Sequence, residues 1–506
     1  MNTKPFWIDV PQRKFPALSR DMTFDAVVVG GGVAGVTTAY LMKRAGLKVA
    51  LVERGRCAQG ETSHTTAHLA AVTDFTFCEL TKKFGSSHAQ AIWDAGFAAI
   101  HQIDENIQQE SIDCDFEWTD GYLHTSFDGD SGNAKQVKQL QDEAACVTSA
   151  GFDAEYMESI PGLLRPGIRF DHQAKFHALK YVSALVDAVN GDGSFVFEQS
   201  EVTEVTGQDK GAQAVKVGSH TLSTAHVVIA THVPIVGKTN MLKATVLQTD
   251  LYQYSTYALR AKIKSDLLPS AMFWDMATPY YYLRVDRDKG GDYVIFGGAD
   301  HKTGQADDER DCFKQVEGKL MAILPGAEIT HRWSGQVIET RDGLPYIGET
   351  APGQFAMTGF SGNGITFSTV GAIMARDAVT GVTNPWRELF DINRTAITRG
   401  LWDYLSENKD YPYYLIRDRF AGTEGKSSRS VRRGEGKVLQ LHGAPVAVYR
   451  HPNGSLSKVS AVCTHMQCLV EWNTAESSWD CPCHGSRFTT TGKVMAGPAE
   501  TPLPRT

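Results

Sequence analysis

The chain has 506 residues, of which 42% are hydrophobic and 21% are charged. This composition is typical of folded globular domains and excludes a largely disordered or fibrous chain. A net charge of −8 at pH 7 argues against a nucleic-acid partner, which would need a basic field. No apolar run approaches the roughly 20 residues of a membrane-spanning helix, and no secretory leader is visible. We therefore expect a cytoplasmic protein without a membrane span, built from about three domains.

After an N-terminal extension of residues 1–23, the sequence predicts a strand, a helix and a second strand. Residues 26–29 form a short apolar run typical of a buried parallel strand, and a glycine-rich loop and a helical pattern follow it. Gly46 ends the helix, and residues 48–52 form the second apolar strand. Parallel strands need such a crossover, so this segment is predicted to be a βαβ unit.

The loop of this unit carries a dinucleotide-binding pattern. Gly30, Gly32 and Gly35 satisfy G-x-G-x-x-G, in which the glycines allow a tight turn, close approach of a pyrophosphate and close helix packing. Glu53 ends the second strand, where an acid binds ribose hydroxyls. The free N–H groups of the helix N-terminus favour the phosphate. The loop alone leaves open whether the nucleotide is FAD or NAD.

Further along the chain, the pattern changes twice. Residues 76–155 are mainly helical in pattern, residues 221–230 form another apolar strand, and residues 245–300 alternate β-branched and aromatic residues as in an antiparallel sheet. Residues 343–381 again show glycine-rich loops and a helical pattern, as near the N-terminus. We therefore expect a discontinuous α/β nucleotide-binding domain with a second domain inserted into it.

The cysteines are unevenly spread. Five are scattered singly, and four crowd into the C-terminal region, where they alternate with histidines. Cys463-x-His465 and Cys481-x-x-His484 place one thiolate and one imidazole on each of two loops, which is the ligand set of a Rieske [2Fe–2S] centre. Zinc is the alternative, because Cys₂His₂ is also a zinc set, although the order differs from that of a zinc finger. The scattered cysteines are Cys57, Cys78, Cys114, Cys146 and Cys312.

The nucleotide-binding part resembles the D-amino-acid oxidase and glycine oxidase family of flavoproteins. The resemblance rests on VVVGGGVAG at 27–35, VALVERG at 49–55, ETSHTTAHL at 61–69, RDGLPYIGE at 341–349 and the glycine-rich stretch at 358–381. It covers roughly residues 24–385 and implies FAD, a flavin-binding domain and a sheet-built substrate domain. No second G-x-G-x-x-G unit for a nicotinamide is visible.

The resemblance also assigns further residues. Gly362, Asn363 and Gly364 open a helix whose N-terminus would stabilise the reduced, anionic flavin. His64 lies where some relatives attach FAD covalently; we expect it beside the flavin, and free flavin after acid denaturation. Arg54 and Val202 complete the expected FAD contacts. In the substrate domain, the chemistry of the residues rather than the resemblance makes Arg284, in YYYLRV, the candidate clamp for a substrate carboxylate; an arginine on the strand surface is the alternative. Tyr282 alternates onto the same strand face.

The C-terminal part resembles Rieske domains of the quinol–cytochrome c reductase type, on CTHMQC at 463–468 and CPCHGS at 481–486. This resemblance implies that Cys468 and Cys483 form a disulfide that braces the two ligand loops. It also implies that the Ser486 hydroxyl donates to a bridging sulfide, which favours the reduced cluster. Phe488 stands where high-potential members often carry a tyrosine, so we expect a lower potential than theirs.

Together these features predict an α/β FAD-binding (Rossmann-like) domain, an inserted antiparallel-sheet substrate domain and a small all-β Rieske domain. The flavoprotein region is expected over 24–385, a linker over 386–435 and the Rieske domain over 436–506. Within the flavoprotein region, we assign the FAD-binding segments to about 24–75, 155–240 and 335–385, and the substrate domain to about 76–154 and 241–334.

The predicted function is that of a dehydrogenase acting on a C–N bond of a small amine or amino-acid-like substrate. The flavin would take two electrons, and the cluster would pass them singly to a separate acceptor, a carrier protein or a quinone. A non-catalytic electron-transfer or redox-sensing protein is the alternative. A Rieske oxygenase would need an additional iron site of two histidines and a carboxylate, for which we find no convincing spacing.

Overall fold

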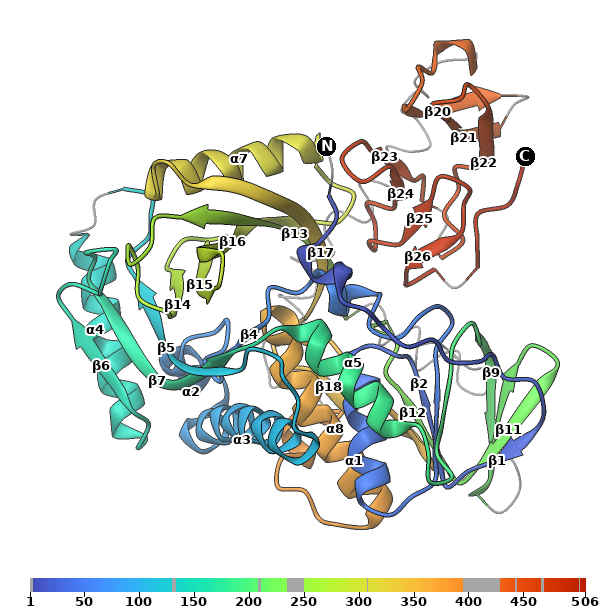
Figure 1. The fold of residues 1–506 in the computed structure, drawn as a ribbon, viewed down its shortest axis with the longest axis horizontal. Helices are drawn as coiled ribbons and strands as arrows, with labels where there is room; N and C mark the ends of the chain where they lie inside the picture. The colour runs from blue at the N-terminus through green and yellow to red at the C-terminus, as the bar shows by residue number, and fades with distance from the viewer. Residues whose placement is uncertain are drawn as a thin grey trace.

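The computed structural model describes residues 3–129, 133–207, 211–233, 250–306, 308–394, 428–441, 444–465, 468–499 and 501–506. Figure 1 shows two larger units that contact each other and a smaller unit of β-strands at the C-terminal end. The longest stretches outside the described residues fall in three predicted segments: 234–240 of the FAD-binding domain, 241–249 of the substrate domain and 395–427 of the linker.

The flavin-binding unit is built on a six-stranded sheet of order β18-β19-β12-β2-β3-β8. The predicted βαβ unit is confirmed as β2 (Ala26–Val29), α1 (Val33–Arg44) and β3 (Val49–Val52). The single strand expected over 221–230 is instead two strands, β11 (His220–Thr224) and β12 (His226–Ile229), which belong to different sheets. The other strands are β8 (Phe195–Phe197), β18 (Tyr346–Ala351) and β19 (Gln354–Thr358).

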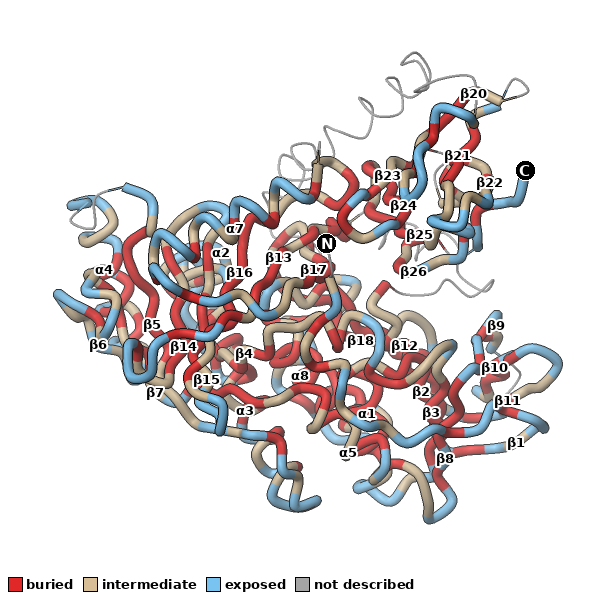
Figure 2. The backbone as a smooth tube through the Cα atoms, turned by 45° about the horizontal axis from the view of Figure 1, so that its top comes forward, coloured by how far each residue is buried: buried red, intermediate tan, exposed pale blue. Residues whose placement is uncertain are grey.

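This sheet is the middle of three layers, which explains its continuous apolar sequence. Ala26 and Val28 pack on one face against a core that includes α1, α5 (Ala178–Val189) and α8 (Gly364–Thr380). Val27 and Val29 pack on the other face against a small sheet of order β1-β11-β10-β9. A strand buried on both faces needs no polar alternation, and Figure 2 shows these central strands in red. The small sheet adds β1 (Met22–Thr23), β9 (Val202–Gly207) and β10 (Gln213–Val217).

The second unit is the expected sheet-built domain. Its nine strands run in the order β17-β13-β16-β15-β14-β5-β7-β4, with β6 paired to β7. The long strands β13 (Leu251–Ile263), β15 (Tyr282–Asp288), β16 (Gly291–Lys302) and β17 (Glu328–Thr340) form its antiparallel half. The remaining strands are β4 (His68–Leu69), β5 (Glu117–His124), β6 (Ala154–Met157), β7 (Gly167–Lys175) and β14 (Met272–Asp275).

The predicted boundary between these two units needs a correction. Strand β7 pairs with β5 along nearly its whole length, so it belongs to the substrate-domain sheet, whereas the sequence analysis placed 155–240 in the FAD-binding domain. The sequence gives no sign of this pairing because the two strands are separated by helix α4. The helices of this part of the chain are α2 (Phe77–Phe84), α3 (Ser86–Glu110), α4 (Ala134–Ser149) and, after β16, α7 (Glu309–Ile323).

The N-terminal extension is part of the core. Trp7, in the short helix η1 (Phe6–Asp9), is 1% exposed, and its indole Nε1 donates to the carbonyl of Thr65 at 2.7 Å. The start of the expected linker is also folded: Phe390, in α9 (Arg387–Phe390), is fully buried, and the Arg394 guanidinium pairs with Asp342.

The C-terminal unit consists of two small antiparallel sheets, β20-β21-β22 and β23-β24-β25-β26. It begins before residue 436, because Val431 is 2% exposed and packs against Leu439, Val446 and Val448. The strands are β20 (Gly436–Leu441), β21 (Ala444–Arg450), β22 (Leu456–Ser460), β23 (Glu471–Asn473), β24 (Ser478–Asp480), β25 (Arg487–Thr489) and β26 (Val494–Ala496).

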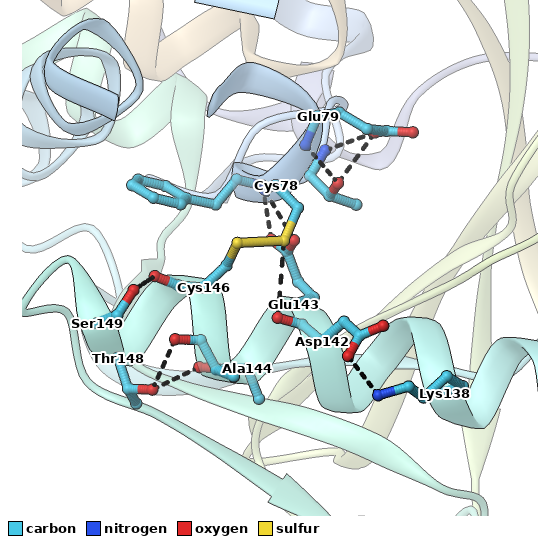
Figure 3. Close-up of a disulfide and its surroundings, with 12 residues drawn as sticks. Cys78, Glu79, Lys138, Asp142, Glu143, Ala144, Cys146, Thr148 and Ser149 are labelled. Atoms are coloured by element: carbon cyan, nitrogen blue, oxygen red, sulfur yellow. Dashed lines mark hydrogen bonds and ion pairs between the residues drawn. A yellow bond between two sulfur atoms is a disulfide. The ribbon is translucent and has the colours of Figure 1, made fainter. Parts of the chain in front are cut away.

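The structure contains two disulfides. Cys468 is joined to Cys483, as the Rieske resemblance implied. Cys78 in α2 is joined to Cys146 in α4, and the Glu143 carboxylate beside them accepts the backbone N–H groups of Phe77 and Cys78 (Figure 3). No sequence pattern indicates this pairing, because each cysteine is isolated in the sequence and 68 residues separate the two.

A search of the described helices for a membrane span found none with sufficient length and apolarity.

Replacing Trp7 tests whether the extension is structural. Trp7→Ala removes a fully buried aromatic side chain and should destabilise the flavin-binding unit by about 3–5 kcal/mol, measured by chemical denaturation. Leu164→Ala is the control, because Leu164 is 76% exposed. An unchanged unfolding curve for Trp7→Ala would show that residues 1–23 are a dispensable appendage.

Candidate functional site

Glycine occurs at the three positions of the loop for different structural reasons. A Cβ on Gly35 would lie 1.9 Å from the Gly30 carbonyl oxygen, so only glycine lets α1 pack this close to the loop. Gly30 has φ +106°, and a Cβ there would lie 2.5 Å from the carbonyl oxygen of Ala230. A Cβ on Gly32 would meet only the Thr62 hydroxyl, at 3.2 Å. The loop therefore leaves space in front of the N-terminus of α1, where a pyrophosphate fits.

Thr62 is a site residue that the sequence analysis missed. Its hydroxyl Oγ1 accepts the Val33 backbone N–H at 2.9 Å, in the first turn of α1. The hydroxyl thus lies over the helix N-terminus, with its own proton directed elsewhere. The quoted motif ETSHTTAHL contains this residue, but its spacing from the glycine loop gives no sign of the contact.

Glu53 contacts both the glycine loop and the segment that leads to Val202. The Glu53 carboxylate accepts the backbone N–H groups of Gly31 and Gly55, both at 2.7 Å. The Glu53 carbonyl accepts the N–H of Ser200, two residues before Val202. Arg54 differs from its expected role, because its guanidinium donates to the Met495 carbonyl of the C-terminal unit at 2.7 Å. The guanidinium of Arg54 therefore contacts the C-terminal unit.

The second glycine segment forms η5 (Ser361–Asn363), which continues directly into α8. The Asn363 side chain donates to the carbonyls of Ala70 and Val72, so it fastens the loop after β4 rather than facing a ligand. The Gly362 N–H donates to the Asp74 carboxylate at 2.9 Å. A Cβ on Gly364 would meet nothing within 4 Å, so open space remains in front of this helix N-terminus.

His64 lies on the short helix η2 (Glu61–His64). Its Nδ1 is 3.3 Å from both the Gly60 carbonyl and the Ser63 hydroxyl, and its carbonyl accepts the Trp333 indole N–H at 2.8 Å. The helix η2 therefore lies between two elements. Thr62 contacts the start of α1 at the glycine loop, and His64 contacts Trp333 of strand β17.

The structure argues against Arg284 as a carboxylate clamp. This side chain is 3% exposed, and its Nε and Nη2 form a bidentate pair with Asp286. Its Nη1 donates to the carbonyls of Thr66, Ala67 and Phe176. Every nitrogen is thus committed to the protein, and the guanidinium holds the loop before β4 against the sheet.

Tyr282 remains a candidate, together with two carboxylates that the sequence analysis did not select. The Tyr282 hydroxyl lies 3.1 Å from the Thr256 hydroxyl, and its ring packs edge-on against His68. Asp300 Oδ1 is buried without a hydrogen-bond partner among the described residues, and burial raises the pKa of this carboxyl to about 7. Asp74 accepts from the Tyr280 hydroxyl at 2.9 Å, and desolvation raises its pKa. The site therefore combines tyrosine hydroxyls with carboxylates.

The four expected cluster ligands are brought together in the C-terminal unit. Cys463 and Cys481 are buried and take part in no disulfide. The rings of His465 and His484 have centroids 4.9 Å apart. Burial lowers the pKa of His465 to about 4 and that of His484 to about 3, so both imidazoles are neutral at pH 7. Two thiols and two neutral imidazoles fit a Rieske cluster.

The surroundings of these ligands also fit the cluster. The Cys481 Sγ lies within 4.8 Å of both sulfurs of the Cys468–Cys483 disulfide, so the disulfide packs directly beside the ligands. Ser486 is fully buried, and its hydroxyl oxygen accepts the Ala499 N–H at 3.0 Å. This hydrogen bond leaves the hydroxyl proton available for a cluster sulfide.

Comparison with known proteins agrees with this geometry. The family model "FAD dependent oxidoreductase" (DAO) matches residues 25–377, and the model "Rieske [2Fe-2S] domain" matches residues 424–506. The chain is 30% identical over 500 residues to the putative Rieske 2Fe-2S iron-sulfur protein YhfW of Bacillus subtilis, covering 98% of this chain and 95% of that one.

Two further relatives match the flavoprotein part. Gamma-glutamylputrescine oxidoreductase of Escherichia coli is 24% identical over 389 residues, covering 72% of this chain and 86% of that one. Glycine oxidase of Geobacillus kaustophilus superimposes with a TM-score of 0.59 at 19% identity, covering 74% of this chain and 99% of that structure. The chain therefore belongs to the DAO family of FAD-dependent oxidoreductases and carries a C-terminal Rieske [2Fe–2S] domain.

Proposed function

We propose that this protein is a dehydrogenase that oxidises a small amine at FAD and passes the electrons through its own Rieske cluster to an external carrier protein or quinone. The observation that supports the proposal most directly is the contact between the Rieske domain and the flavoprotein part of the chain. Gln305 Nε2 donates to the Pro482 carbonyl at 3.0 Å, and Gln336 Nε2 donates to the Gly485 carbonyl at 2.9 Å. The loop that bears Cys481 and His484 thus lies against the flavoprotein part of the same chain.

The residues proposed to hold FAD are the glycine loop, Glu53, Thr62 and the N-terminus of α8. When bound, FAD supplies an acceptor for two electrons as a hydride. The loop N–H groups and the Thr62 hydroxyl would bind the pyrophosphate, and Glu53 would exchange its loop contacts for ribose hydroxyls. Gly364 leaves the space in which the helix dipole would act on the flavin.

The substrate group that this site favours is a cationic amine. With Arg284 committed elsewhere, the described polar groups around Tyr282 are hydroxyls, the carboxylates Asp74 and Asp300, and the His68 imidazole, whose pKa burial lowers to about 3, so that it is uncharged at neutral pH. Carboxylates attract an ammonium group and repel a substrate carboxylate. Asp300 also has an oxygen free to take the proton that an ammonium must lose before hydride transfer. The amine-containing substrate named for the Escherichia coli relative supports this assignment.

The test is an anaerobic screen of amines and amino acids with two readouts. A true substrate should bleach the oxidised flavin absorbance and then produce the paramagnetic signal of a reduced Rieske cluster. If dioxygen is then admitted and reoxidises the reduced flavin at the rate of turnover, the protein is an oxidase instead. A complete absence of flavin bleaching across the screen would favour the non-catalytic alternative.

The first residue-level prediction concerns FAD binding. Gly32→Val places a branched side chain in the space in front of α1, so FAD content should fall from about one per chain to well below half. The measurement is the flavin absorbance of the purified protein after acid release. Gly318→Ala is the control, because a Cβ there meets nothing within 4 Å. Full FAD occupancy in Gly32→Val would place the pyrophosphate elsewhere.

The second prediction concerns the cluster potential. Ser486→Ala removes a hydrogen bond that stabilises the more negative, reduced cluster, so the midpoint potential should fall. A hydrogen bond to a charged group contributes about 1.5–3 kcal/mol, which corresponds to about 60–130 mV for one electron. Redox titration followed by electron paramagnetic resonance measures this shift. Thr491→Ala, on the surface of the same domain, should leave the potential unchanged, and an equal shift in both variants would contradict the assignment.

The third prediction concerns the pH dependence. Because the pKa of Asp300 is raised to about 7, this group is protonated below that pH and loses its attraction for an ammonium. The kcat/KM for an amine substrate should therefore fall as pH decreases through about 7. Asp300→Asn should lower kcat/KM at pH 8 and remove this acidic limb. An unaltered pH profile in Asp300→Asn would exclude the group from substrate binding.

A further inference from the structure

The Rieske domain contacts the flavoprotein through a set of buried polar side chains at the end of the large sheet. We call this set, Gln253, Ser255, Thr303 and Gln336, the polar seat. Its members come from β13, the end of β16 and β17, and each is at most 7% exposed. The Thr303 hydroxyl lies 3.0 Å from the Ser255 hydroxyl and 3.3 Å from Gln336 Nε2. The side chains of Ser255, Thr303 and Gln336 are thus held in one network, and Gln253 joins it through its backbone carbonyl, which accepts the Thr303 N–H at 2.9 Å.

The second ligand loop of the cluster rests on this polar seat. Gly485 has φ +70°, and a Cβ there would lie 2.6 Å from Cβ of Gln253, so the loop backbone is pressed against that side chain. Gly304, which follows Thr303, would place a Cβ 2.8 Å from the Cys481 carbonyl carbon. Both sides of the contact therefore need glycine, which shows a close backbone approach between the two domains.

Gln336 is the member that joins this loop to the flavin side. Its side chain donates to the carbonyl of Gly485, the neighbour of the ligand His484. Its backbone N–H donates to the Glu61 carboxylate at 2.7 Å. Glu61 begins η2, the helix that carries Thr62, whose hydroxyl accepts from the first turn of α1, and His64, which the family resemblance assigns to the flavin. One residue therefore touches both the cluster loop and the segment assigned to the cofactor.

A second contact keeps this residue aligned. Ser334, two positions earlier on the same face of β17, donates to the Glu476 carboxylate of the Rieske domain. Glu476 is also paired with Arg487, which is buried and in addition paired with Asp480. The strand that carries Gln336 is thus held to β24 and β25, the strands that flank the second ligand loop.

We propose that Gln336 is a positioning residue that sets the geometry for electron transfer from the flavin to the Rieske cluster. The inference rests on the proposed function, because it assumes that the flavin is the electron donor of the cluster. In the step concerned, the reduced flavin loses one electron and one Fe(III) of the cluster becomes Fe(II). No bond between heavy atoms forms or breaks, so the rate depends on the position of the two groups.

The experiment measures this step directly in the holoprotein and without a substrate. Anaerobic illumination with a sacrificial donor reduces the flavin, and the appearance of the reduced-cluster signal is followed in time. Gln336→Met keeps the side-chain size but removes the donor to Gly485. Gln305→Met is the matched control, because it removes the other donor to the same loop, to Pro482, without any contact to Glu61. FAD and iron contents identify any variant that fails to assemble.

Gln336→Met should slow cluster reduction by about tenfold, equivalent to about 1.4 kcal/mol, and Gln305→Met should stay closer to the wild-type rate. The cluster potential should be unchanged in both, because neither side chain touches a ligand atom. Hydrogen exchange of the segment 481–486 should increase in Gln336→Met, which reports the loosened loop independently of turnover.

Four results would overturn the inference, and they differ in whether the proposed function also fails. Wild-type transfer rates in Gln336→Met, or equal slowing in both variants, would remove the special role of Gln336 and leave the proposed function intact. A shifted cluster potential in Gln336→Met would show that its effect is electronic rather than positional. If the photoreduced flavin of the wild-type protein never reduces the cluster, the proposed function itself fails, together with this inference.

Discussion

The segment from Glu61 to Ala67 is the point to which the other parts of this structure are fastened. Its Thr62 hydroxyl accepts from the first turn of α1, and its Glu61 carboxylate accepts from β17. Its backbone carbonyls accept from the Trp7 and Trp333 indoles and from the Arg284 guanidinium. An irregular segment can be buried only if its backbone polar groups find such partners. The glycine loop, the substrate sheet, the N-terminal extension and, through Gln336, the Rieske domain therefore meet at one short stretch.

This arrangement explains why Arg284 is better understood as a structural residue than as a substrate ligand. A buried guanidinium is costly unless its charge is paired and its donors are used. Asp286 supplies the charge and lies next to Lys175, whose ammonium also pairs with Glu117. The carbonyls of the 61–67 segment and of Phe176 use the remaining donors. The polar groups left near Tyr282 are carboxylates, hydroxyls and the uncharged His68 imidazole, which is the basis for proposing an amine rather than a carboxylate as the substrate group.

The sequence predicted those features whose physical cause is local. The glycine loop, the βαβ unit, the antiparallel-sheet pattern at 245–300 and the paired C-x-H and C-x-x-H loops each depend on residues within one short stretch. It could not predict features that depend on which distant segments meet. Arg284 has the chemistry of a clamp, and only the carbonyls from residues 66, 67 and 176 show that its donors are used. The pairing of Cys78 with Cys146, the burial of Trp7 and the turn of Arg54 toward Met495 likewise depend on the packed fold.

The contact between the flavoprotein and the Rieske domain has a chemical character suited to fixing position. Gln253 and Gln336 each keep a buried amide oxygen without a hydrogen-bond partner among the described residues, and each such atom costs about 1–3 kcal/mol. An interface selected for strength alone would replace these amides with apolar side chains of similar size. The amide donors, the two close glycine contacts and the Ser334–Glu476 bond all restrict how the ligand loop can lie on the sheet. In the proposed electron transfer, a cofactor that gives up two electrons and a cluster that accepts one at a time would have to adopt the same geometry twice per turnover. This interface is therefore better suited to fixing the orientation of the ligand loop than to maximising the free energy of docking.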